Sequence, residues 1–390
     1  MLSMKKITFL INSLTSGGAE KVLSVIITEL IEQKFEVELL CIERDDVQPL
    51  PPEVKRVYLS SLTKYDSNIK KFIYLPYLAL KLKKHIRKSN ITLIQSHIYR
   101  ANFINLLAKL FGSKHKAQVV EVTSIGYLMG GSLSQKINLF LVKTLYKYAD
   151  MVIFKAKKMK SEYIKYINNN SSYTIIHNPY DIEKIERLAC EPIDDFEFKK
   201  SKKYITTVSR LSKEKQHKKM MEALLELEES IELIIIGDGI IIDELEEYAK
   251  LLKLSKRVHF LGKKSNPFKY VKASDIFLLA SKGEGFPNVL VEAMICGTPV
   301  ISTDCISGPR EILAPSTDID FQLTDKIEIA QNGILYPVDK NRLLIEAIEL
   351  LINNKELQKS YSKKGKLEAK RYALKKIVEE YKGVIFNKSQ

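Results

Sequence analysis

Short apolar runs alternate with helix-like segments along this chain. We predict strands at 6–12, 35–42, 91–97, 119–123 and 151–154. Between the first two strands, residues 21–33 carry apolar side chains at helical spacing, and a second helix is predicted to follow His97 and to continue through Leu110. Strands that alternate with helices indicate an α/β fold with a parallel, doubly wound sheet.

The same alternation restarts after a charged linker near residues 190–203. Further strands are predicted at 204–210, 231–237, 258–262, 276–280 and 299–302, with helices at 215–227 and 241–252. A chain of 390 residues is long for one core. We therefore expect two Rossmann-like domains, 1–195 and 196–365, and a C-terminal helix, 366–390, that packs back on the first. Ligands bind at the carboxyl ends of such sheets.

The stretch 283–299 is the most informative part of the chain and reads GEGFPNVLVEAMICGTP. Pro287 suits the first turn of a helix, and Gly297 suits the position just past the helix end. Glu284 then lies on a loop, and Glu292 lies in the second helical turn, about 7 Å further along the axis. A helix N-terminus favours phosphate, and carboxylates accept hydrogen bonds from sugar hydroxyls. The stretch predicts a site for a ligand with a charged middle and hydroxylated ends.

Other candidates also follow predicted strands, where ligands bind. Arg210 and Lys215 offer two cations to a diphosphate. The same sequence would also fit two solvent-exposed basic residues on a charged loop without a ligand. Gly17 and Gly18 can let the backbone approach a phosphate, but a lone Gly-Gly is more often a turn. A strand-end histidine such as His97 is more often structural than catalytic, and Gly237 belongs to a Gly-Asp-Gly turn signal.

Metal, disulfide and membrane-spanning features are poorly supported. Asp318 and Asp320 have a DxD spacing, but they lie in a polar stretch that we interpret as a solvated loop. The four cysteines have no CxxC spacing, and Cys41 and Cys296 are expected in the core of a protein from a reducing compartment. We expect neither a signal peptide nor a spanning helix, and a cytoplasmic protein.

The net charge of +15 is concentrated in one region. Residues 51–165 hold 22 Lys and Arg against 5 Asp and Glu, a balance of +17 that leaves −2 for the rest. Such a field suggests nucleic acid, an anionic membrane or a phosphorylated substrate, or else lysine-rich solvated surfaces. Residues 68–88 have apolar positions at helical spacing, either for a membrane interface or for packing on the sheet. No nucleic-acid-binding module is recognisable, so nucleic acid is not expected.

These motifs together resemble the retaining glycosyltransferases of family 4, which have the GT-B fold with a catalytic cleft between two Rossmann-like domains. The resemblance covers nearly the whole chain and rests chiefly on the E-x7-E element of Glu284 and Glu292. It also includes SGGAE at 16–20, the strand-end His97, VSRLSKEK at 208–215, IIGDG at 235–239, VHFLG at 258–262, Asn266-Pro267 and SGPREIL at 307–313.

The resemblance implies a role for each matching residue. Arg210 and Lys215 would bind the donor diphosphate, Glu292 the ribose hydroxyls, and Glu284 the hydroxyls of the donor sugar. From the first domain, Gly17 and Gly18 would approach the phosphates and the acceptor, and His97 would lie near the reacting sugar. The backbone of Leu261 through Lys263 would hold the nucleotide base. The remaining donor-binding residues would be Gly237, Gly285, Phe286, Pro287, Asn288, Val289 and Leu290. Gln216 departs from the glycine or asparagine that is frequent in the family.

The resemblance also implies the reaction. The acceptor hydroxyl would attack the anomeric carbon of the donor sugar on the same face from which the diphosphate leaves. The leaving phosphate would assist deprotonation of that hydroxyl. Neither a metal nor a cofactor would be required. The donor would be a UDP-sugar, and the acceptor a glycan on undecaprenyl diphosphate at the cytoplasmic face of the inner membrane. Two alternatives stay open: a transferase with a soluble acceptor, such as a glycogen- or sucrose-type synthase, and a sugar-nucleotide 2-epimerase of similar fold.

Overall fold

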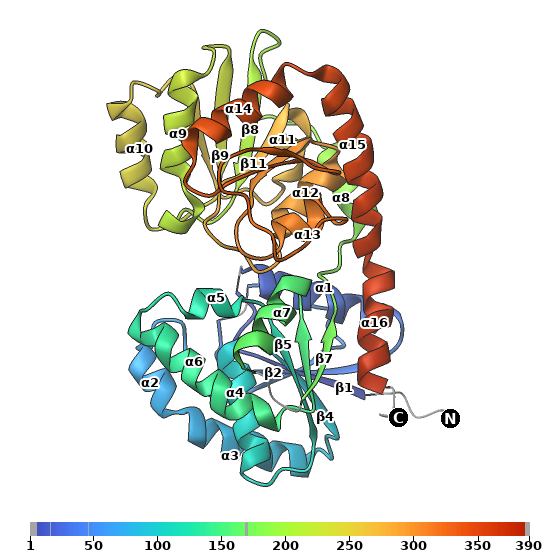
Figure 1. Cartoon of the computed structure of the whole chain (residues 1–390). Helices are drawn as coiled ribbons and strands as arrows, with labels where there is room; N and C mark the ends of the chain where they lie inside the picture. The colour runs from blue at the N-terminus through green and yellow to red at the C-terminus, as the bar shows by residue number, and fades with distance from the viewer. Residues whose placement is uncertain (1–5, 16, 46, 168–170, 387–390) are drawn as a thin grey trace. The chain divides into compact units, whose positions relative to one another are not determined.

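The computed structural model of the chain describes residues 6–15, 17–45, 47–167 and 171–386. These residues form two compact units (Figure 1). The first runs to Pro179 and resumes at Leu374, and the second comprises Tyr180–Ala373. Each unit contains a seven-stranded, largely parallel sheet with helices on both faces, which confirms the predicted pair of doubly wound domains.

The sheet of the first unit is parallel throughout. Its strands are β1 Lys6–Ile11, β2 Glu36–Cys41, β3 Lys55–Tyr58, β4 Leu93–His97, β5 Lys116–Glu121, β6 Met151–Phe154 and β7 Ser172–Ile175. They are ordered β3-β2-β1-β4-β5-β6-β7. The central strands are buried on both faces, and each contains apolar residues from which the strand could be predicted. Strands β2, β4 and β5 also bury polar side chains, among them Glu38, Gln95 and Gln118. The edge strands β3 and β7 lack such runs, and the prediction missed them.

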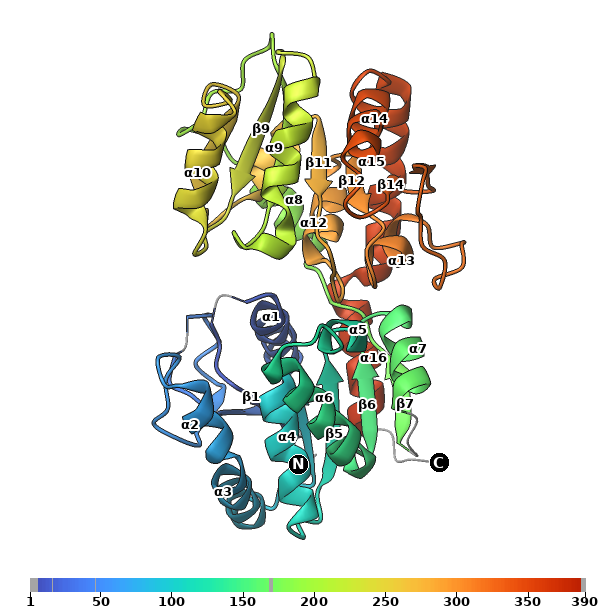
Figure 2. The ribbon, with the colours of Figure 1, turned by 60° about the vertical axis from the view of Figure 1, so that its left-hand side comes forward.

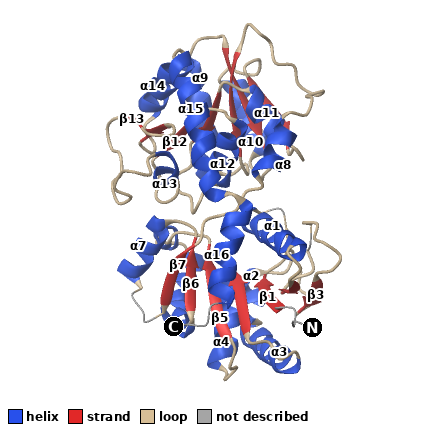
Figure 3. Cartoon of the chain, turned by 90° about the vertical axis from the view of Figure 1, so that its right-hand side faces the viewer, coloured by secondary structure: helices blue, strands red, loops and turns tan. Residues whose placement is uncertain are grey.

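Helices cover both faces of this sheet. They are α1 Gly18–Glu32, α2 Asn68–Ile73, α3 Leu75–Lys88, α4 Tyr99–Leu110, α5 Ile125–Leu128, α6 Leu133–Leu145, α7 Lys157–Tyr166 and α16 Leu374–Phe386. Phe9 and Leu39 point to the face covered by α1 and α16, and Leu10 and Leu40 point to the face covered by α3 and α4. Figure 3 shows α16 and α1 on the near side of the sheet.

The apolar stripe predicted within residues 68–88 is a packing surface. Leu75, Leu78, Leu82 and Ile86 of this stripe are buried against the sheet and α4. Phe72, the remaining member, lies in α2 and is partly exposed. Pro76 lies in the first turn of α3, just after the boundary between the two helices. Of the two interpretations left open by the sequence, packing on the sheet is therefore correct for this stripe.

The second unit repeats the plan. Its strands are β8 Lys203–Val208, β9 Ile231–Ile236, β10 Val258–Gly262, β11 Ile276–Leu279, β12 Val300–Thr303, β13 Glu328–Ile329 and β14 Ile334–Tyr336. They are ordered β10-β9-β8-β11-β12-β14-β13, and β13 alone of these is antiparallel to its neighbour. All the strands predicted here are confirmed to within two residues, while β13 and β14 were not predicted.

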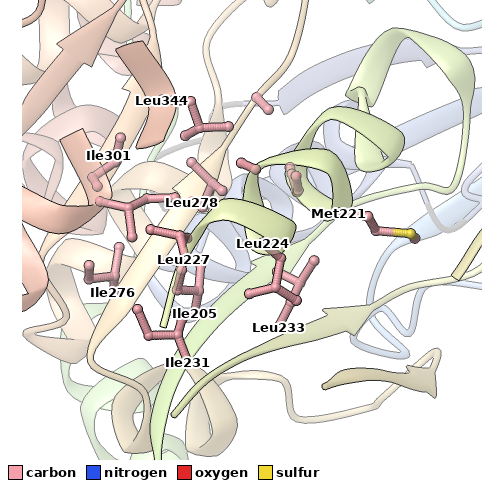
Figure 4. Packing of buried hydrophobic residues seen from close by; sticks show 14 of the residues in the cluster. Ile205, Met221, Leu224, Leu227, Ile231, Leu233, Ile276, Leu278, Ile301 and Leu344 are labelled. Carbon is pink, nitrogen blue, oxygen red and sulfur yellow. The ribbon is translucent and has the colours of Figure 1, made fainter. Parts of the chain in front are cut away.

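Its helices again cover both faces of the sheet. They are α8 Ile182–Ala189, α9 His217–Glu226, α10 Ile242–Leu251, α11 Phe268–Ala273, α12 Asn288–Cys296, α13 Pro309–Leu313, α14 Asn341–Ile352 and α15 Lys355–Ala369. Figure 2 shows α9 in front of the sheet, with α8 and α12 behind it. Met221 and Leu224 of α9 pack with Leu233 and Leu278 of the strands in the main core of this unit (Figure 4).

The division between the units differs from the boundaries predicted at residues 195 and 366. Helix α8 packs against α11 and α12, and α15 packs against α12, so both belong to the second unit. Ile185 of α8 and Tyr361 of α15 are buried there. The predicted boundary followed the charged linker, whereas the apolar faces of these two helices decide which sheet they cover.

Cys41, Cys296 and Cys305 are buried and Cys190 is exposed, all four as free thiols, so the predicted core positions of Cys41 and Cys296 are confirmed. Among the described residues, no helix is both long enough and apolar enough to span a bilayer.

Candidate active site

The segment after β11 has the predicted strand, loop and helix. Helix α12 begins at Asn288, and Gly297 closes it with a φ of +80°. Glu284 lies on the loop and Glu292 in the second helical turn, as expected. Pro287 precedes the helix as its N-cap residue, one position earlier than predicted. The N-terminus of α12 therefore lies next to the glutamate loop, and its first-turn N–H groups have no partner one helical turn earlier within the helix.

A short ion pair links this loop to the neighbouring strand end. Lys215 Nζ lies 2.6 Å from Glu284 Oε1, and the two side chains are 18% and 14% exposed. Lys215 ends a 3₁₀ turn after β8, and β8 is the parallel neighbour of β11. The backbone N–H of Lys282 also donates to the carbonyl of Glu214 over 2.9 Å. Two predicted site residues from distant parts of the sequence thus meet at the carboxyl edge of the sheet.

Arg210 follows β8 by two residues and is exposed. The loop that carries Arg210 packs closely against two glycines that follow β9. An added Cβ would lie 1.8 Å from the Ser209 carbonyl oxygen at Gly237, and 2.1 Å from the Leu211 carbonyl oxygen at Gly239. Only glycine therefore allows the two loops to approach this closely. Leu211 N–H donates to the Asp238 carbonyl over 2.9 Å. The Gly-Asp-Gly turn therefore sets the course of the backbone that carries Arg210.

The departure at Gln216 has a conformational explanation. Gln216 has φ +56° and ψ +36°, the left-handed region that glycine and asparagine adopt most readily. Its side-chain amide donates to Asp339, whose other carboxylate oxygen lies 3.2 Å from Lys282 Nζ. A long side chain is accommodated here because it ties the turn to another loop of the same unit.

A second loop supports Glu284 from the β12 side. Glu284 N–H donates to the Ile306 carbonyl over 3.4 Å, and Ser307 Oγ donates to the Gly285 carbonyl over 2.9 Å. Ser307 and Gly308 both have positive φ, and a Cβ on Gly308 would lie 2.4 Å from Pro287 Cδ. Only glycine fits against the start of α12 without displacing it.

Arg310, from the same SGPREIL motif, is buried beneath this loop. Its guanidinium donates to both carboxylate oxygens of Asp304, at 3.0 and 2.6 Å, and lies 3.0 Å from Glu328. Both partners in the Asp304–Arg310 pair are at most 5% exposed. Such a bidentate pair fixes the plane of the guanidinium, so it holds the two ends of the loop 304–310 together.

The start of α12 has further partners that the sequence did not reveal. Tyr180 Oη donates to Asn288 Oδ1 over 2.6 Å. The ring of Phe286 packs edge-on against that of Tyr372, with centroids 5.4 Å apart. These partners are more than 80 residues away in sequence, so no local motif could have identified them. Val289 and Leu290 belong to the first helical turn, and Leu290 is buried in the core.

The segment predicted to hold the base follows β10. The Gly262 carbonyl accepts a hydrogen bond from Gly237 N–H over 2.9 Å. Leu261 is half-buried against the cluster around Tyr204, and Lys263 is exposed. The loops after β8, β9 and β10 are therefore joined through backbone hydrogen bonds.

The glycines predicted in the first unit lie at a helix N-terminus. Gly17 is the N-cap residue of α1, Gly18 is its first residue, and Ser16 of the same motif lies outside the described residues. Thr15 Oγ1 donates to Glu20 over 3.0 Å. The placement agrees with a backbone approach to a ligand, and binding by these glycines remains a prediction.

His97 ends β4, but its side chain is buried, with 1% exposed. Its Nε2 lies 3.2 Å from Gln95 Oε1. Burial, and then the charge of Lys155, holds the pKa of His97 well below its usual value, so the imidazole is neutral at pH 7. Ile98, which follows it, has φ +72°, an uncommon conformation for a β-branched residue that marks local strain. Its predicted contact with the reacting sugar remains a prediction.

Lys155 is buried beside this histidine. Its amine donates to the hydroxyl of Tyr381 in α16, and burial lowers the pKa of Lys155 to about 7. This contact fixes the returning helix to the first unit.

Asp318 and Asp320 are exposed and lie outside any helix or strand, as expected for a solvated loop. The described part of the chain contains no cluster of three or more His, Cys, Asp or Glu side chains arranged to hold a metal ion.

The structure thus brings Lys215, Glu284 and the start of α12 together in the second unit, with Arg210 on the adjacent loop. Gly17, Gly18 and His97 lie at the carboxyl edge of the other sheet.

Comparisons with known proteins find similar sequences along nearly the whole chain. The family profile described as Glycosyltransferase Family 4 matches residues 16–184, and Glycosyl transferases group 1 matches residues 191–368. The chain is 32% identical over 379 residues to the N-acetylgalactosamine-N,N'-diacetylbacillosaminyl-diphospho-undecaprenol 4-alpha-N-acetylgalactosaminyltransferase of Campylobacter jejuni, with 97% of this chain and 98% of the relative covered. A second transferase of that organism, which adds N-acetylgalactosamine to a GalNAc-GalNAc-diNAcBac-PP-undecaprenol, is 24% identical, with 97% of each covered.

Solved structures share the fold. Anabaena HepE in complex with UDP matches with a TM-score of 0.74 and 18% identity, covering 98% of this chain and 99% of HepE. Sucrose-phosphate synthase from Thermosynechococcus elongatus matches with a TM-score of 0.79 and 16% identity, covering 98% of each chain.

Proposed function

Because this chain belongs to family 4 of the glycosyltransferases and has their two-domain GT-B fold, we propose that it transfers a hexose or N-acetylhexosamine from a UDP-sugar to a lipid-linked glycan, with retention of configuration. The observation that carries this proposal is the Lys215–Glu284 pair beside the N-terminus of α12. It puts a cation, a carboxylate and the positive end of a helix dipole at the carboxyl edge of one sheet, which suits the diphosphate and sugar of a donor.

Each side chain has a role in this proposal. Lys215 and Arg210 bind the diphosphate, and the N-terminus of α12 adds a positive dipole end. Glu284 accepts hydrogen bonds from the donor sugar, and Glu292 from the ribose. A diphosphate at this place competes with Glu284 for Lys215, so donor binding exchanges the ion pair for a lysine–phosphate contact and frees the carboxylate for sugar hydroxyls.

The reaction needs charge stabilisation more than a strong base. As the bond between the anomeric carbon and the phosphate oxygen breaks, negative charge grows on the departing diphosphate, next to Lys215 and Arg210. The acceptor hydroxyl attacks from the same face, its oxygen forms the new bond to the anomeric carbon, and its proton passes to the departing phosphate. Two cations and a helix N-terminus supply the charge that a divalent ion would otherwise supply, so we propose that no metal is required.

The acceptor is proposed to be a glycan on a polyprenyl diphosphate. Both Campylobacter relatives carry such an acceptor in their names, and one of them aligns with nearly the whole of this chain. This favours a lipid-linked acceptor over a soluble sugar. A 2-epimerase is disfavoured because both of these relatives are named as transferases. A 2-epimerase would convert the donor without any acceptor, so the two activities can be told apart by experiment.

A donor screen tests the proposal. The purified protein is mixed in turn with UDP-GalNAc, UDP-GlcNAc, UDP-Gal, UDP-Glc and a GDP-sugar, and its thermal unfolding and the release of nucleotide are measured with and without a lipid-linked acceptor. We expect at least one UDP-sugar to raise the melting temperature and to turn over faster with acceptor. The proposal would be contradicted if only the GDP-sugar raised the melting temperature, or if the rate of donor conversion were the same with and without acceptor.

A further inference from the structure

Large apolar side chains are exposed on the outer side of α2 and α3. They are Ile69 and Ile73 of α2 and Tyr77 and Leu80 of α3, each between 54% and 73% exposed. Ile69 and Ile73 are four positions apart in α2, and Tyr77 and Leu80 are three apart in α3, so each pair lies on one face of its helix. The α3 pair lies on a different face from the buried stripe of that helix. Monomeric soluble proteins seldom gather apolar side chains in this way unless the surface binds something.

Helix α6 repeats the pattern. Leu133 and Phe140 lie seven positions apart on one of its faces and are 75% and 64% exposed. Lys136 lies between them on the same face, and Lys143 follows one turn later. Both lysines are exposed, and neither is paired with an acidic side chain among the described residues. α6 therefore presents apolar and basic side chains together.

The two surfaces belong to one layer of helices. α3 and α6 both pack against α4, on the face of the sheet opposite α1 and α16. Figure 1 shows α2, α3, α4 and α6 on this side of the first unit. The exposed Lys81 and Lys84 extend the α3 face along the helix, and they too have no acidic partner within the described ranges. We call these six apolar residues and four lysines the apolar–basic face.

Charge decides which partner this face fits. It lies within residues 51–165, where the balance is +17, and it includes four lysines without an acidic partner among the residues that the structure describes. A second copy of the chain would bring like charges together, which disfavours self-association. Anionic lipid headgroups attract lysines, each contributing about 1 kcal/mol near the surface, while the apolar side chains enter the headgroup region.

We propose that the apolar–basic face docks the first unit onto an anionic lipid bilayer. The inference rests on the proposed function in that a lipid-linked acceptor gives the docking its purpose. Aromatic and branched apolar side chains insert between headgroups, and the flanking lysines neutralise lipid phosphates. The enzyme then works on an acceptor whose diphosphate lies at the same surface.

Sedimentation with vesicles tests the docking without any sugar chemistry. The full-length protein is spun with vesicles of pure phosphatidylcholine and with vesicles containing phosphatidylglycerol, neither holding acceptor. The variants are I73E/L80E and K81E/K84E. Matched controls are L251E/L367E, which alters exposed apolar residues of the second unit, and K359E/K363E, which alters exposed lysines of α15. Far-UV circular dichroism and melting temperature verify that each variant folds.

We expect the wild type and both controls to bind phosphatidylglycerol vesicles and to bind phosphatidylcholine weakly. Reversing two lysines should lower the partition coefficient at least about thirtyfold, from about 1 kcal/mol for each charge, and I73E/L80E should lower it about as much. Three results would overturn the inference. The wild type could fail to bind anionic vesicles, the test variants could bind as well as the controls, or the face could mediate dimerisation instead. Transfer to a short, water-soluble acceptor, measured in parallel, would show the proposed function intact even if docking fails.

Discussion

At the scale of single residues, the donor site depends on one lysine. Lys215 Nζ is the cation held against Glu284, and the proposal places it on the departing phosphate. Lys215→Ala should lower kcat at least about 100-fold, the usual loss for a charge-stabilising donor, measured by nucleotide release. Lys213→Ala, which removes an exposed lysine from the same turn, is the control and should be near wild type. A Lys215→Ala enzyme with a near-normal rate would refute this role.

The two glutamates should separate in their effects. Glu292→Ala should weaken donor binding, since the ribose contact is the same in the ground and transition states. Glu284→Ala should lower kcat more than it changes donor affinity, since the sugar hydroxyls belong to the reacting ring. Calorimetric titration with UDP and with the UDP-sugar, together with steady-state rates, distinguishes the two. Unaltered UDP affinity in Glu292→Ala would contradict this division.

His217 gives the second unit a pH dependence. It is buried, with Nε2 2.8 Å from Ser209 Oγ, and burial followed by the charge of Lys215 lowers its pKa from 6.5 to about 4. The unfolded chain therefore binds more protons between these values, and the free energy of unfolding falls as the pH falls from about 6.5 to about 4, by up to about 1.4 kcal/mol per pH unit from this group.

His217→Gln keeps a hydrogen-bonding side chain but does not titrate. Urea unfolding of the second unit at pH 7.5, 6 and 4.5 should show a shallower pH dependence for the variant than for the wild type. His97 and His115 of the first unit, whose pKa values are also lowered by burial, are present in both proteins. Equal slopes in the two proteins would show that His217 is not held neutral.

The positions of the E-x7-E element, Arg210 and Lys215 at strand ends were predictable, because each follows an apolar run that predicts a strand. The partners that support them were not. Tyr180 on Asn288 and Asp339 on Gln216 join positions more than 100 residues apart. Nothing in a local pattern carries such a pairing.

At the scale of elements, Gly237 shows how one turn sets the position of another. An added Cβ would lie 1.8 Å from the Ser209 carbonyl oxygen, and the φ of +149° is unfavourable for other residues. Gly237→Ala should lower the free energy of unfolding by about 1–3 kcal/mol, the usual cost of overpacking, and weaken UDP binding by displacing the Arg210 loop. The control is Gly283→Ala, since an added Cβ there meets nothing within 4 Å. Equal stability of the two variants, by urea unfolding, would contradict this account.

Elements were predictable in proportion to their burial. β9, with six buried residues, and β11, with four, follow from apolar runs alone. β13 has two residues and β14 three, too few to give a pattern. The stripe on α3 was visible in the sequence, but only the sheet beneath it shows that it is a packing surface, and that Tyr77 and Leu80 lie on a different face.

At the scale of the whole molecule, the two doubly wound units were predictable because each repeats strand and helix with its own core. The division at Pro179 was not, because α8 and α15 follow the apolar surfaces available to them rather than composition. The uneven charge was visible at once, while the apolar side chains that accompany it emerge only when the helices are assembled.

The account's central claim is that this chain transfers sugar from a UDP-sugar with retention and with charge supplied by the protein. The most direct measurement is the reaction of the UDP-sugar found by the screen with a polyprenyl-diphosphate-linked glycan in excess EDTA, followed by NMR of the new glycosidic bond. The account predicts transfer at an undiminished rate and an α-linkage from an α-linked donor. A β-linkage, or transfer that appears only when a divalent ion is restored, would contradict it.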